Sequence, residues 1–186
     1  MYTTDSSTTL EKAIANHTPL TTAAALEIYD SLDPVDIEFM IGRWQGQGVP
    51  SNHPMDGLLE AGNWYGKEFI NADHVHPLLM RSFDDSIIKV APNPTIMSGV
   101  LKMPTLDTEN PLLKPMFGGL NAVLQTQESQ ARLRMMEHRG QVTATMIYDY
   151  LPIHDSFRKL DENRVFGVMD YKEIDQPFFF VLTRAQ

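Results

Sequence analysis

The sequence contains no cysteine, which excludes disulfide bonds, thiolate nucleophiles and cysteine-ligated metals. It also has no run of about 18 apolar residues, the length that a membrane-spanning helix needs. Basic residues are few, with 15 Lys and Arg against 24 Asp and Glu, so the net charge is −9. Nucleic acid and anionic membrane surfaces are therefore not expected partners. Because the N-terminus lacks a basic start followed by an apolar core, we expect a soluble cytoplasmic protein without membrane insertion.

The 186 residues, 42% of them hydrophobic, suit one globular domain with a substantial core. Residues 1–32 are expected to form a helical extension. Within it, Thr8 and Glu11 form a capping box for a short helix, and the stretch TTAAALEIYDSL carries apolar residues at helical spacing. Asp33 and Pro34 end this second helix. The remaining residues, 33–186, are expected to form a single domain.

The stretch IGRWQGQGVP, residues 41–50, places three glycines and a tryptophan at alternate positions. A phosphate-binding loop requires a strand before the glycines and a helix after them, whereas here the helical pattern comes first. A flexible linker is also disfavoured, because Ile41, Trp44 and Val49 are strongly apolar. Glycines on one face of a strand allow a sharp bend or a close backbone approach. The stretch therefore predicts the first strand of a closed sheet.

From Ala131 onward the pattern is that of short strands joined by short turns. The sequence ARLRMMEHRGQVTATMIYDYLP contains two extended runs separated by Arg139 and Gly140, which predicts a hairpin. Two further strands, RVFGVMDY and FFFVLTR, are bounded by turn residues. We expect an antiparallel meander over about 121–186. Before it, the glycines and prolines of residues 91–120 predict an irregular insertion, with a helical turn around residues 112–116.

The Gly-X-Trp motif of Gly42 and Trp44, preceded by a helix or turn, resembles the first strand of the calycins, which include lipocalins and fatty-acid-binding proteins. The resemblance implies a mainly β protein, a calycin-like antiparallel β-barrel with short N-terminal helices. It also implies that the tryptophan closes one barrel end under a basic residue of the last strand, a position that Arg184 fits. The longer motif, Gly42 to Gly48, is similar to that of the haem-binding nitrobindins. Their iron-binding histidine lies near the C-terminus, where FFFVLTRAQ has none, so we expect no haem and no other cofactor.

The broadest resemblance is to the GXWXG-domain family, whose members carry a companion C-terminal domain of unknown function. It is carried by FMIGRWQGQGVPSNHPMDGLLEAGNWYGKEF, HPLL, MEHRGQVTATMIYDYLPIHDSFRKLDE, GVMD and FFFVL, which together span most of residues 33–184. The GXWXG part corresponds to about 33–90. The resemblance implies no established activity, so the functional prediction rests on the residues.

Polar residues at inward positions of a barrel are informative, because a small barrel is either filled by side chains or holds one ligand. If Arg134 and Tyr148 point inward, they could receive the carboxylate or carbonyl group of an apolar ligand. Tyr150, Trp64 and Phe117 are expected to line or cover the same cavity. The alternative is that such residues form exposed ion pairs on the outer face or simply fill the core.

Two other kinds of site are conceivable. His154 could act as a general base oriented by Asp149 or Asp155, since imidazole titrates near neutral pH, although no nucleophile accompanies it. The alternative is a structural histidine.

His74 and His76 are two residues apart and would share a face of a strand, where both could ligate a metal ion with help from His53 or Asp73. The alternative is a polar strand end. Without a third assigned ligand, this pair is weak support for a metal site, so we expect none.

Three functions remain open from the sequence. The first is binding of a small hydrophobic or amphipathic molecule in the barrel. The second is a cofactor-independent enzyme that uses His154 and a carboxylate for proton transfer. The third is a filled structural barrel with a protein partner. Oligomeric state cannot be deduced from these residues.

Overall fold

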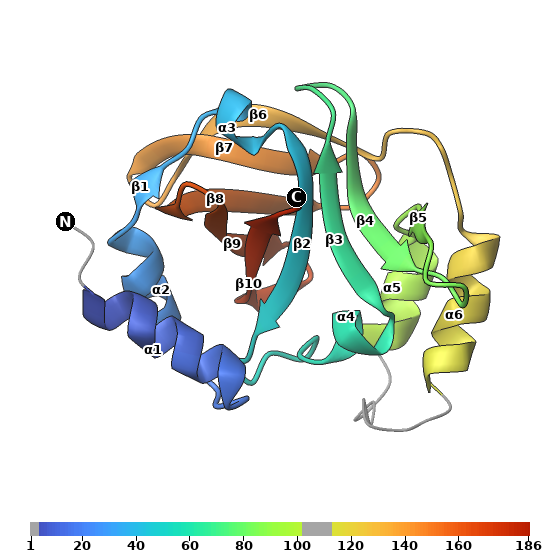
Figure 1. The fold of residues 1–186 in the computed structure, drawn as a ribbon, viewed down its shortest axis with the longest axis horizontal. Coiled ribbons are helices and arrows are strands. Elements are labelled where there is room, and N and C mark those ends of the chain that lie inside the picture. The colour runs from blue at the N-terminus through green and yellow to red at the C-terminus, as the bar shows by residue number, and fades with distance from the viewer. Residues whose placement is uncertain (1–3, 102–112) are drawn as a thin grey trace.

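The computed structural model describes residues 4–101 and 113–186, and within them eight antiparallel strands form a closed barrel (Figure 1). Around the ring the strand order is β8, β7, β6, β4, β3, β2, β10 and β9, and pairing between β8 and β9 closes it. The strands are β2 (Gly42–Val49), β3 (Trp64–Phe69), β4 (Val75–Arg81), β6 (Ala131–His138), β7 (Gln141–Tyr148), β8 (Ile153–Asp161), β9 (Arg164–Tyr171) and β10 (Ile174–Arg184). Two short strands, β1 (Asp33–Pro34) and β5 (Ile87–Lys89), pair with β8 and β4. The predicted fold class is confirmed.

The predicted hairpin is formed by β6 and β7, which pair from Ala131 and Tyr148 to His138 and Gln141. Its two-residue turn has positive φ at both Arg139 and Gly140, the backbone that a tight hairpin requires. The strands of the predicted meander follow in sequence as β8, β9 and β10.

Two N-terminal helices, α1 (Thr4–Ala15) and α2 (Thr22–Asp30), pack against the outside of the barrel (Figure 1). The side chain of Thr21 caps α2 by accepting a hydrogen bond from the amide of Ala24. Beneath the helices lies a second hydrophobic core, formed by Leu10, Ala25, Ile28, Tyr29 and Leu32 with Val49, Phe166, Val168, Phe179 and Val181. Helices α1 and α2 are thus joined to the barrel by a shared core.

The glycines of β2 and β3 make room for aromatic side chains and for close backbone contact. A Cβ atom on Gly46 would overlap the ring of Trp64. Gly66 has φ of +149°, and a Cβ there would overlap the carbonyl oxygen of Trp44 on the neighbouring strand. The register of β3 against β4 shifts on both sides of Gly66. The close backbone approach predicted for this part of the barrel is therefore centred on Gly46 and Gly66.

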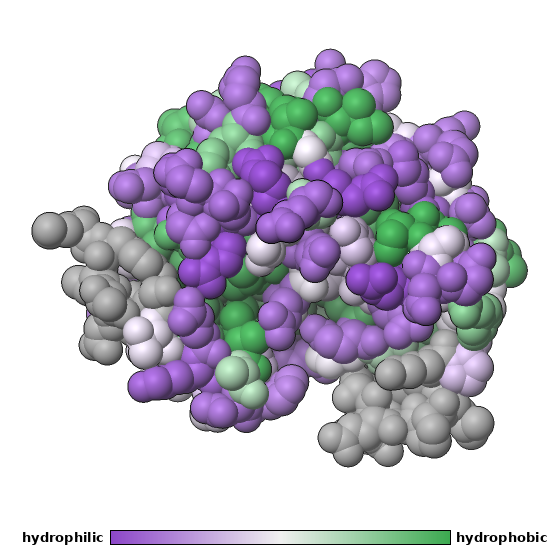
Figure 2. Space-filling view, in the orientation of Figure 1, coloured by the Kyte–Doolittle hydropathy of each residue, from purple (hydrophilic) through white to green (hydrophobic). Residues whose placement is uncertain are grey.

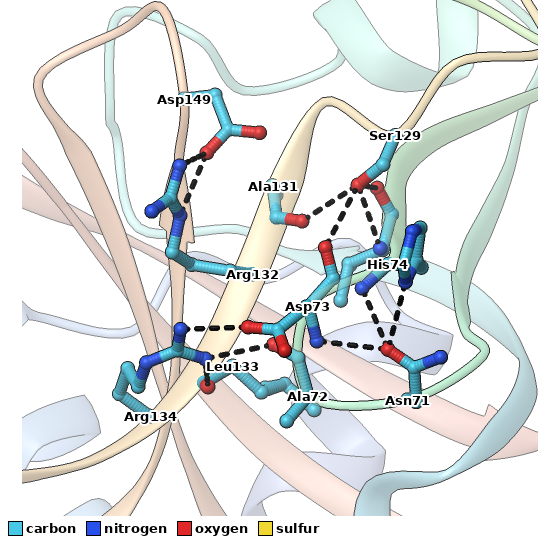
Figure 3. A network of polar contacts seen from close by, with 11 residues as sticks. Asn71, Ala72, Asp73, His74, Ser129, Ala131, Arg132, Leu133, Arg134 and Asp149 are labelled. Carbon is cyan, nitrogen blue, oxygen red and sulfur yellow. Dashed lines mark hydrogen bonds and ion pairs between the residues drawn. The ribbon is translucent and has the colours of Figure 1, made fainter.

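The barrel has a short seam between β4 and β6, where the ladder consists of the single pair Val75 and Ala131. Polar contacts reinforce the seam from outside (Figure 3). The Ser129 hydroxyl accepts a hydrogen bond from the amide of Val75 at 3.0 Å, and the amide of Leu133 donates to the carbonyl oxygen of Ala72 at 2.7 Å.

The described residues form four more helices: α3 (Ile37–Met40), α4 (Leu58–Ala61), α5 (Pro94–Leu101) and α6 (Leu113–Val123) (Figure 1). The prediction of an irregular insertion over 91–120 is wrong for the described residues, which are largely helical. Pro94 begins α5, where Asn93 caps the amides of Thr95 and Ile96. Pro115 lies in the first turn of α6, where an amide hydrogen is not needed. Leu112, part of the predicted helical turn, is outside the described residues.

Hydrophilic side chains cover most of the face seen in Figure 2, with smaller hydrophobic areas between them. Within the described part of the chain, no helix combines the length and the apolar character needed to cross a membrane.

Candidate functional site

The barrel interior is packed with apolar and aromatic side chains. Edge-to-face contacts connect Phe69 with Phe157, Phe157 with Phe180, and Phe180 with Trp64, at centroid distances of 5.7, 6.2 and 6.0 Å. These rings belong to a core that also contains residues of α3 and α4. Any charged group in this interior is therefore unusual and carries information about function.

One charged cluster lies within this apolar interior. The ammonium nitrogen of Lys67 is 2.9 Å from Oδ2 of Asp155, and the two side chains are 4% and 1% exposed. The same nitrogen donates to the carbonyl oxygen of Pro77 at 3.3 Å and to the hydroxyl of Tyr148 at 3.4 Å. The ammonium group thus has one ionic partner and two hydrogen-bond partners. We call Lys67, Asp155 and Tyr148 the lumen cluster.

Aromatic rings surround the cation of the lumen cluster. The Lys67 nitrogen lies 5.1 Å from the ring centroid of Phe180, 5.6 Å from that of Trp64 and 5.7 Å from that of Tyr148. Such ring faces attract a cation that has lost its water. The three rings therefore favour a positive charge at this point of the lumen.

Strand register explains why these side chains meet. Residues paired across an antiparallel ladder point to the same face, and Asp155 pairs with Met146 and Met169, which both belong to the interior core. Tyr148 pairs with Ala131, another core residue. Lys67 shares the inward face of β3 with Phe69. The irregularity at Gly66 lets Trp64 pack against the same core.

Burial governs the protonation of the cluster. It raises the pKa of Asp155 above the ordinary value, while the Lys67 ammonium group opposes this effect. Burial and the nearby Asp155 charge also raise the pKa of Tyr148 well above 10, so the phenol keeps its proton. Neither carboxylate oxygen of Asp155 accepts a hydrogen bond from the described residues, and Oδ2 is the oxygen in the ion pair with Lys67. The cluster therefore presents a phenolic donor and a vacant carboxylate acceptor.

A small cavity adjoins the lumen cluster. Its volume is about 30 Å³, and apart from the cluster its walls are apolar, formed by Met55, Leu59, Trp64, Leu78, Pro92, Met97, Ile153, Met169, Phe178 and Phe180. An open groove of about 500 Å³, lined in part by Pro54, Pro94, Ser98 and Pro152, lies outside. Pro54 precedes Met55, Ser98 follows Met97, and Pro152 precedes Ile153. Residues next to each other in the chain therefore line the groove and the cavity, and the cavity residues among them include two flexible methionines, Met55 and Met97.

The predicted closing pair, Trp44 and Arg184, lies at the end of the barrel near α3. Trp44 is fully buried, and its indole nitrogen donates to the carbonyl oxygen of Met40 at 2.7 Å. The guanidinium carbon of Arg184 lies 4.2 Å from the centroid of the Trp44 ring. Arg184 also donates to the carbonyl oxygens of Ile41 and Phe39 at 3.0 and 2.8 Å. The structure places both residues where the calycin resemblance implies a closing pair.

Three residues predicted to bind a ligand or act as a base instead face outward. Arg134 pairs with Thr145, opposite in face to the inward Leu133, and forms an exposed ion pair with Asp73 at 2.7 Å (Figure 3). Tyr150 lies in the turn after β7 and is 66% exposed. His154 is exposed on the face of β8 opposite Asp155. Their residue types suggested a site, but strand alternation places Arg134 and His154 outside the lumen, and Tyr150 lies beyond the end of β7.

The predicted acid–base set is also not assembled. Asp149 accepts a hydrogen bond from Arg132 at 2.8 Å on the outer surface (Figure 3). Asp155 is inside and paired with Lys67. His154 lies across from Ile147 on the outer face, and the described contacts include no hydrogen bond from His154 to Asp149 or Asp155. The predicted pairing of His154 with either carboxylate is therefore not formed.

The two histidines proposed as metal ligands occupy different environments. His74 is exposed and its Nδ1 lies 3.0 Å from the side-chain oxygen of Asn71 (Figure 3). His76, in contrast, is buried. Asp73 is engaged by Arg134. His53 comes well before His74 in the sequence, and its Nδ1 accepts a hydrogen bond from the amide of Met55. Among the described residues there is no group of three or more histidine or acidic side chains that could hold a metal ion.

Of the predicted lining residues, Tyr148 and Trp64 border the cavity, and Phe117 is buried in the same core. The sequence interpretation missed Lys67. A signal was present, because Lys67 and Phe69 alternate with Glu68 in WYGKEF, so a strand that buries Phe69 also buries Lys67. Its partner Asp155 lies too far along the chain for spacing to connect them.

Fold and interior together define a small closed β-barrel protein with one buried ionic cluster in an apolar lumen. Residues 27–84 match the GXWXG protein model, and residues 129–184 match DUF4334, a domain of unknown function. A crystal structure of a protein from Thermomonospora curvata is 35% identical, with a TM-score of 0.70, covering 98% of this chain and 99% of that one. The chain belongs to the GXWXG family, with a C-terminal DUF4334 domain. No curated protein matches it.

Proposed function

We propose that the barrel binds a small amphipathic molecule whose polar head meets the lumen cluster and whose apolar body lies among the aromatic and methionine side chains. The observation that carries this proposal is the desolvated pair of Lys67 and Asp155, with the Tyr148 hydroxyl beside it. Tyr148 can donate to a carbonyl or carboxylate oxygen of the ligand, and Oδ1 of Asp155 can accept from a ligand hydroxyl.

The free energy required to bury the charges of Lys67 and Asp155 supports a functional role for this pair. Removing two charges from water costs several kcal/mol per ion, and apolar residues of similar size often fill such a site equally well. A barrel that needed only a packed core would be served by leucine or methionine at these positions. The alternative of a filled structural barrel does not explain the ionic pair.

The cavity must widen before a ligand can enter it. A cavity of about 30 Å³ holds roughly one water molecule, so a ligand enters only if wall side chains move. Met55 and Met97 belong to the cavity wall and are next in sequence to Pro54 and Ser98 of the outer groove, and unbranched methionine side chains change rotamer readily. We therefore place the entry route at this wall.

Native mass spectrometry of the purified protein, followed by denaturing extraction, tests the proposal first. A released amphipathic molecule would support it and identify the head group. Thermal unfolding with decanol and decanoate then provides a direct assay, with an expected rise in Tm of about 5 °C or more near saturation.

Matched variants locate the site. Tyr148→Phe removes the inward hydroxyl and should weaken binding about 10-fold, whereas Tyr150→Phe removes an exposed hydroxyl and should leave binding unchanged. Arg134→Ala, on the outer face, should also leave it unchanged. If neither amphiphile binds and nothing co-purifies, the filled barrel becomes the better explanation.

A further inference from the structure

We propose that Lys67 forms an imine with an aldehyde or ketone that enters the lumen. This inference rests on the proposed ligand-binding function and names its substrate class as carbonyl compounds with an apolar body. The observations that carry it are the position of the Lys67 amine on the cavity wall, the Tyr148 hydroxyl 3.4 Å from that nitrogen, and the Asp155 carboxylate 2.9 Å from it.

The cluster contains the groups that imine formation uses. The amine must be unprotonated to attack, and the proton of the ammonium group can pass to Asp155, which is in contact with it. Burial also raises the pKa of Asp155, which favours such a transfer. The carbonyl oxygen of the ligand can accept a hydrogen bond from Tyr148, which activates the carbonyl carbon beside the amine.

The step balances without any further reactant. The Lys67 nitrogen adds to the carbonyl carbon, and the carbonyl oxygen takes a proton from Asp155 to give a carbinolamine. The carbinolamine nitrogen returns one proton to Asp155, which passes it to the hydroxyl group. The C–O bond then breaks, water leaves and the nitrogen lone pair forms the C=N bond. The sum is one ammonium group and one carbonyl compound giving one protonated imine and one water, and Asp155 ends as a carboxylate.

The surroundings of Lys67 also suit the protonated imine that the reaction forms. A protonated imine keeps one positive charge at the position of the ammonium group. Asp155 remains its counter-ion, and the rings of Phe180, Trp64 and Tyr148 still face it. The apolar walls exclude bulk water, which would otherwise hydrolyse the imine.

The surface lysines offer an internal comparison. Lys159 forms an exposed ion pair with Glu162, its side chain being 32% exposed. Its nitrogen lies 5.2 Å from the ring centroid of Phe39, whereas three rings surround the buried nitrogen of Lys67. An aldehyde that reacts only by random collision should label Lys159 more than Lys67, because Lys67 is nearly inaccessible. An aldehyde bound in the lumen should reverse that order.

The test is reductive trapping of the intact wild-type protein with octanal and sodium cyanoborohydride, followed by proteolysis and mass spectrometry. The expected result is a peptide in which Lys67 has gained the mass of octanal less one oxygen atom, labelled about 10-fold or more faster than Lys159. Tyr148→Phe should slow the labelling of Lys67 about 10-fold. Lys67→Arg should abolish it, because a guanidinium group does not form the imine.

Parallel thermal unfolding with octanal and the unreactive octanol separates the two proposals. If both raise Tm while Lys67 stays unlabelled, imine formation is overturned and the binding function stands. If neither raises Tm and Lys67 stays unlabelled, both are overturned. Labelling of Lys67 no faster than of Lys159 also overturns the inference. Because the main readout uses wild-type protein, it does not depend on any variant folding.

Discussion

The guanidinium carbon of Arg184 lies 4.2 Å from the centroid of the Trp44 ring, which joins the last strand of the barrel to the first. Arg184 also donates to the carbonyl oxygens of Phe39 and Ile41, and Trp44 donates to that of Met40. These bonds satisfy carbonyl groups of α3 and the residue after it, where a helix leaves carbonyl groups unpaired. One stacked pair thus secures the barrel end and the segment that leads into it.

Replacing Arg184 should therefore destabilise the protein even when the charge is kept. We expect Arg184→Lys to lower the free energy of unfolding by about 1–3 kcal/mol, since an ammonium group cannot both cover the indole and donate to two carbonyl oxygens in the same geometry. Urea denaturation followed by tryptophan fluorescence measures the change. Arg43→Lys, in a more exposed ion pair with Glu68, is the control and should change stability by less than about 1 kcal/mol. Equal effects at both positions would contradict the closing role.

The buried pair of Lys67 and Asp155 should show opposite results for single and double replacement. Lys67→Met alone leaves an unpaired carboxyl group in the lumen and should cost roughly 3–5 kcal/mol of unfolding free energy. Lys67→Met combined with Asp155→Leu should restore stability to about that of the wild type or above it. Urea unfolding near neutral pH checks both. A double variant as unstable as the single one would show that the pair holds the barrel together, which would favour a structural role.

The same single variant should respond to pH in a defined direction. With Lys67 gone, burial is opposed only by the weaker effect of His154, so the pKa of Asp155 in the folded state is raised above that of the unfolded chain. The folded state then holds the proton more tightly, and the stability of Lys67→Met falls as pH rises from the unfolded value toward the folded one. Unfolding curves at several pH values measure this slope, which the double variant should lack.

Turn chemistry and alternation allowed the C-terminal strands to be predicted, because each is short and bounded by its own turn residues. The same alternation, applied without a fixed register, could not decide which face of β6 or β8 turns inward. Arg134 and His154 were therefore predicted to face inward or to act together with residues that do. The decisive pairings, such as Ala131 with Tyr148, connect different strands, and only the assembled barrel reveals them.

The lumen cluster was partly visible in the sequence. Tyr148 and Asp155 were candidates because they stand among apolar residues, but they were assigned to different kinds of site. Lys67 was missed because its partner lies on a distant strand, and because a lysine on a strand is usually exposed. The helices of residues 91–123 were underestimated for a different reason. Their prolines stand in first turns, where proline is tolerated, although proline density suggested irregular structure.

Glycine replacements should distinguish a tightly packed position from a position with open space beside it. Gly66→Ala forces a Cβ onto the carbonyl oxygen of Trp44 at a positive φ, so we expect a loss of roughly 2–4 kcal/mol or failure to fold. Gly119→Ala lies within α6, where a Cβ meets nothing within 4 Å, and should stabilise the protein by about 0.5–1 kcal/mol. Thermal unfolding of both variants makes the comparison. A neutral Gly66→Ala would mean that β2 and β3 are not in close contact at this point.

Because of His53, the free energy of unfolding should be smaller in mild acid than at neutral pH. Its Nδ1 accepts from the amide of Met55 at 3.0 Å and its Nε2 lies 3.0 Å from the carbonyl oxygen of Gln176, an arrangement that requires the neutral ring with hydrogen on Nε2. Burial lowers the pKa of His53 below its ordinary value of 6.5, an effect that the Gln176 carbonyl and Asp56 oppose. Since the unfolded chain takes up a proton that the folded one refuses, stability is full above about pH 6.5 and falls as pH drops toward the folded pKa.

Urea unfolding at about pH 7.5 and about pH 5.5 measures this loss. His53→Gln can still donate to the Gln176 carbonyl and should reduce the difference between the two pH values. His76 and His138, whose pKa values burial also lowers, should supply the remainder. His154→Gln is the control, because it removes an exposed imidazole without disturbing a buried hydrogen bond. The prediction fails if His53→Gln and the wild type lose equal stability between the two pH values. Because His53 holds Met55 in the wall of the cavity, the same protonation should loosen the proposed entry route to the lumen.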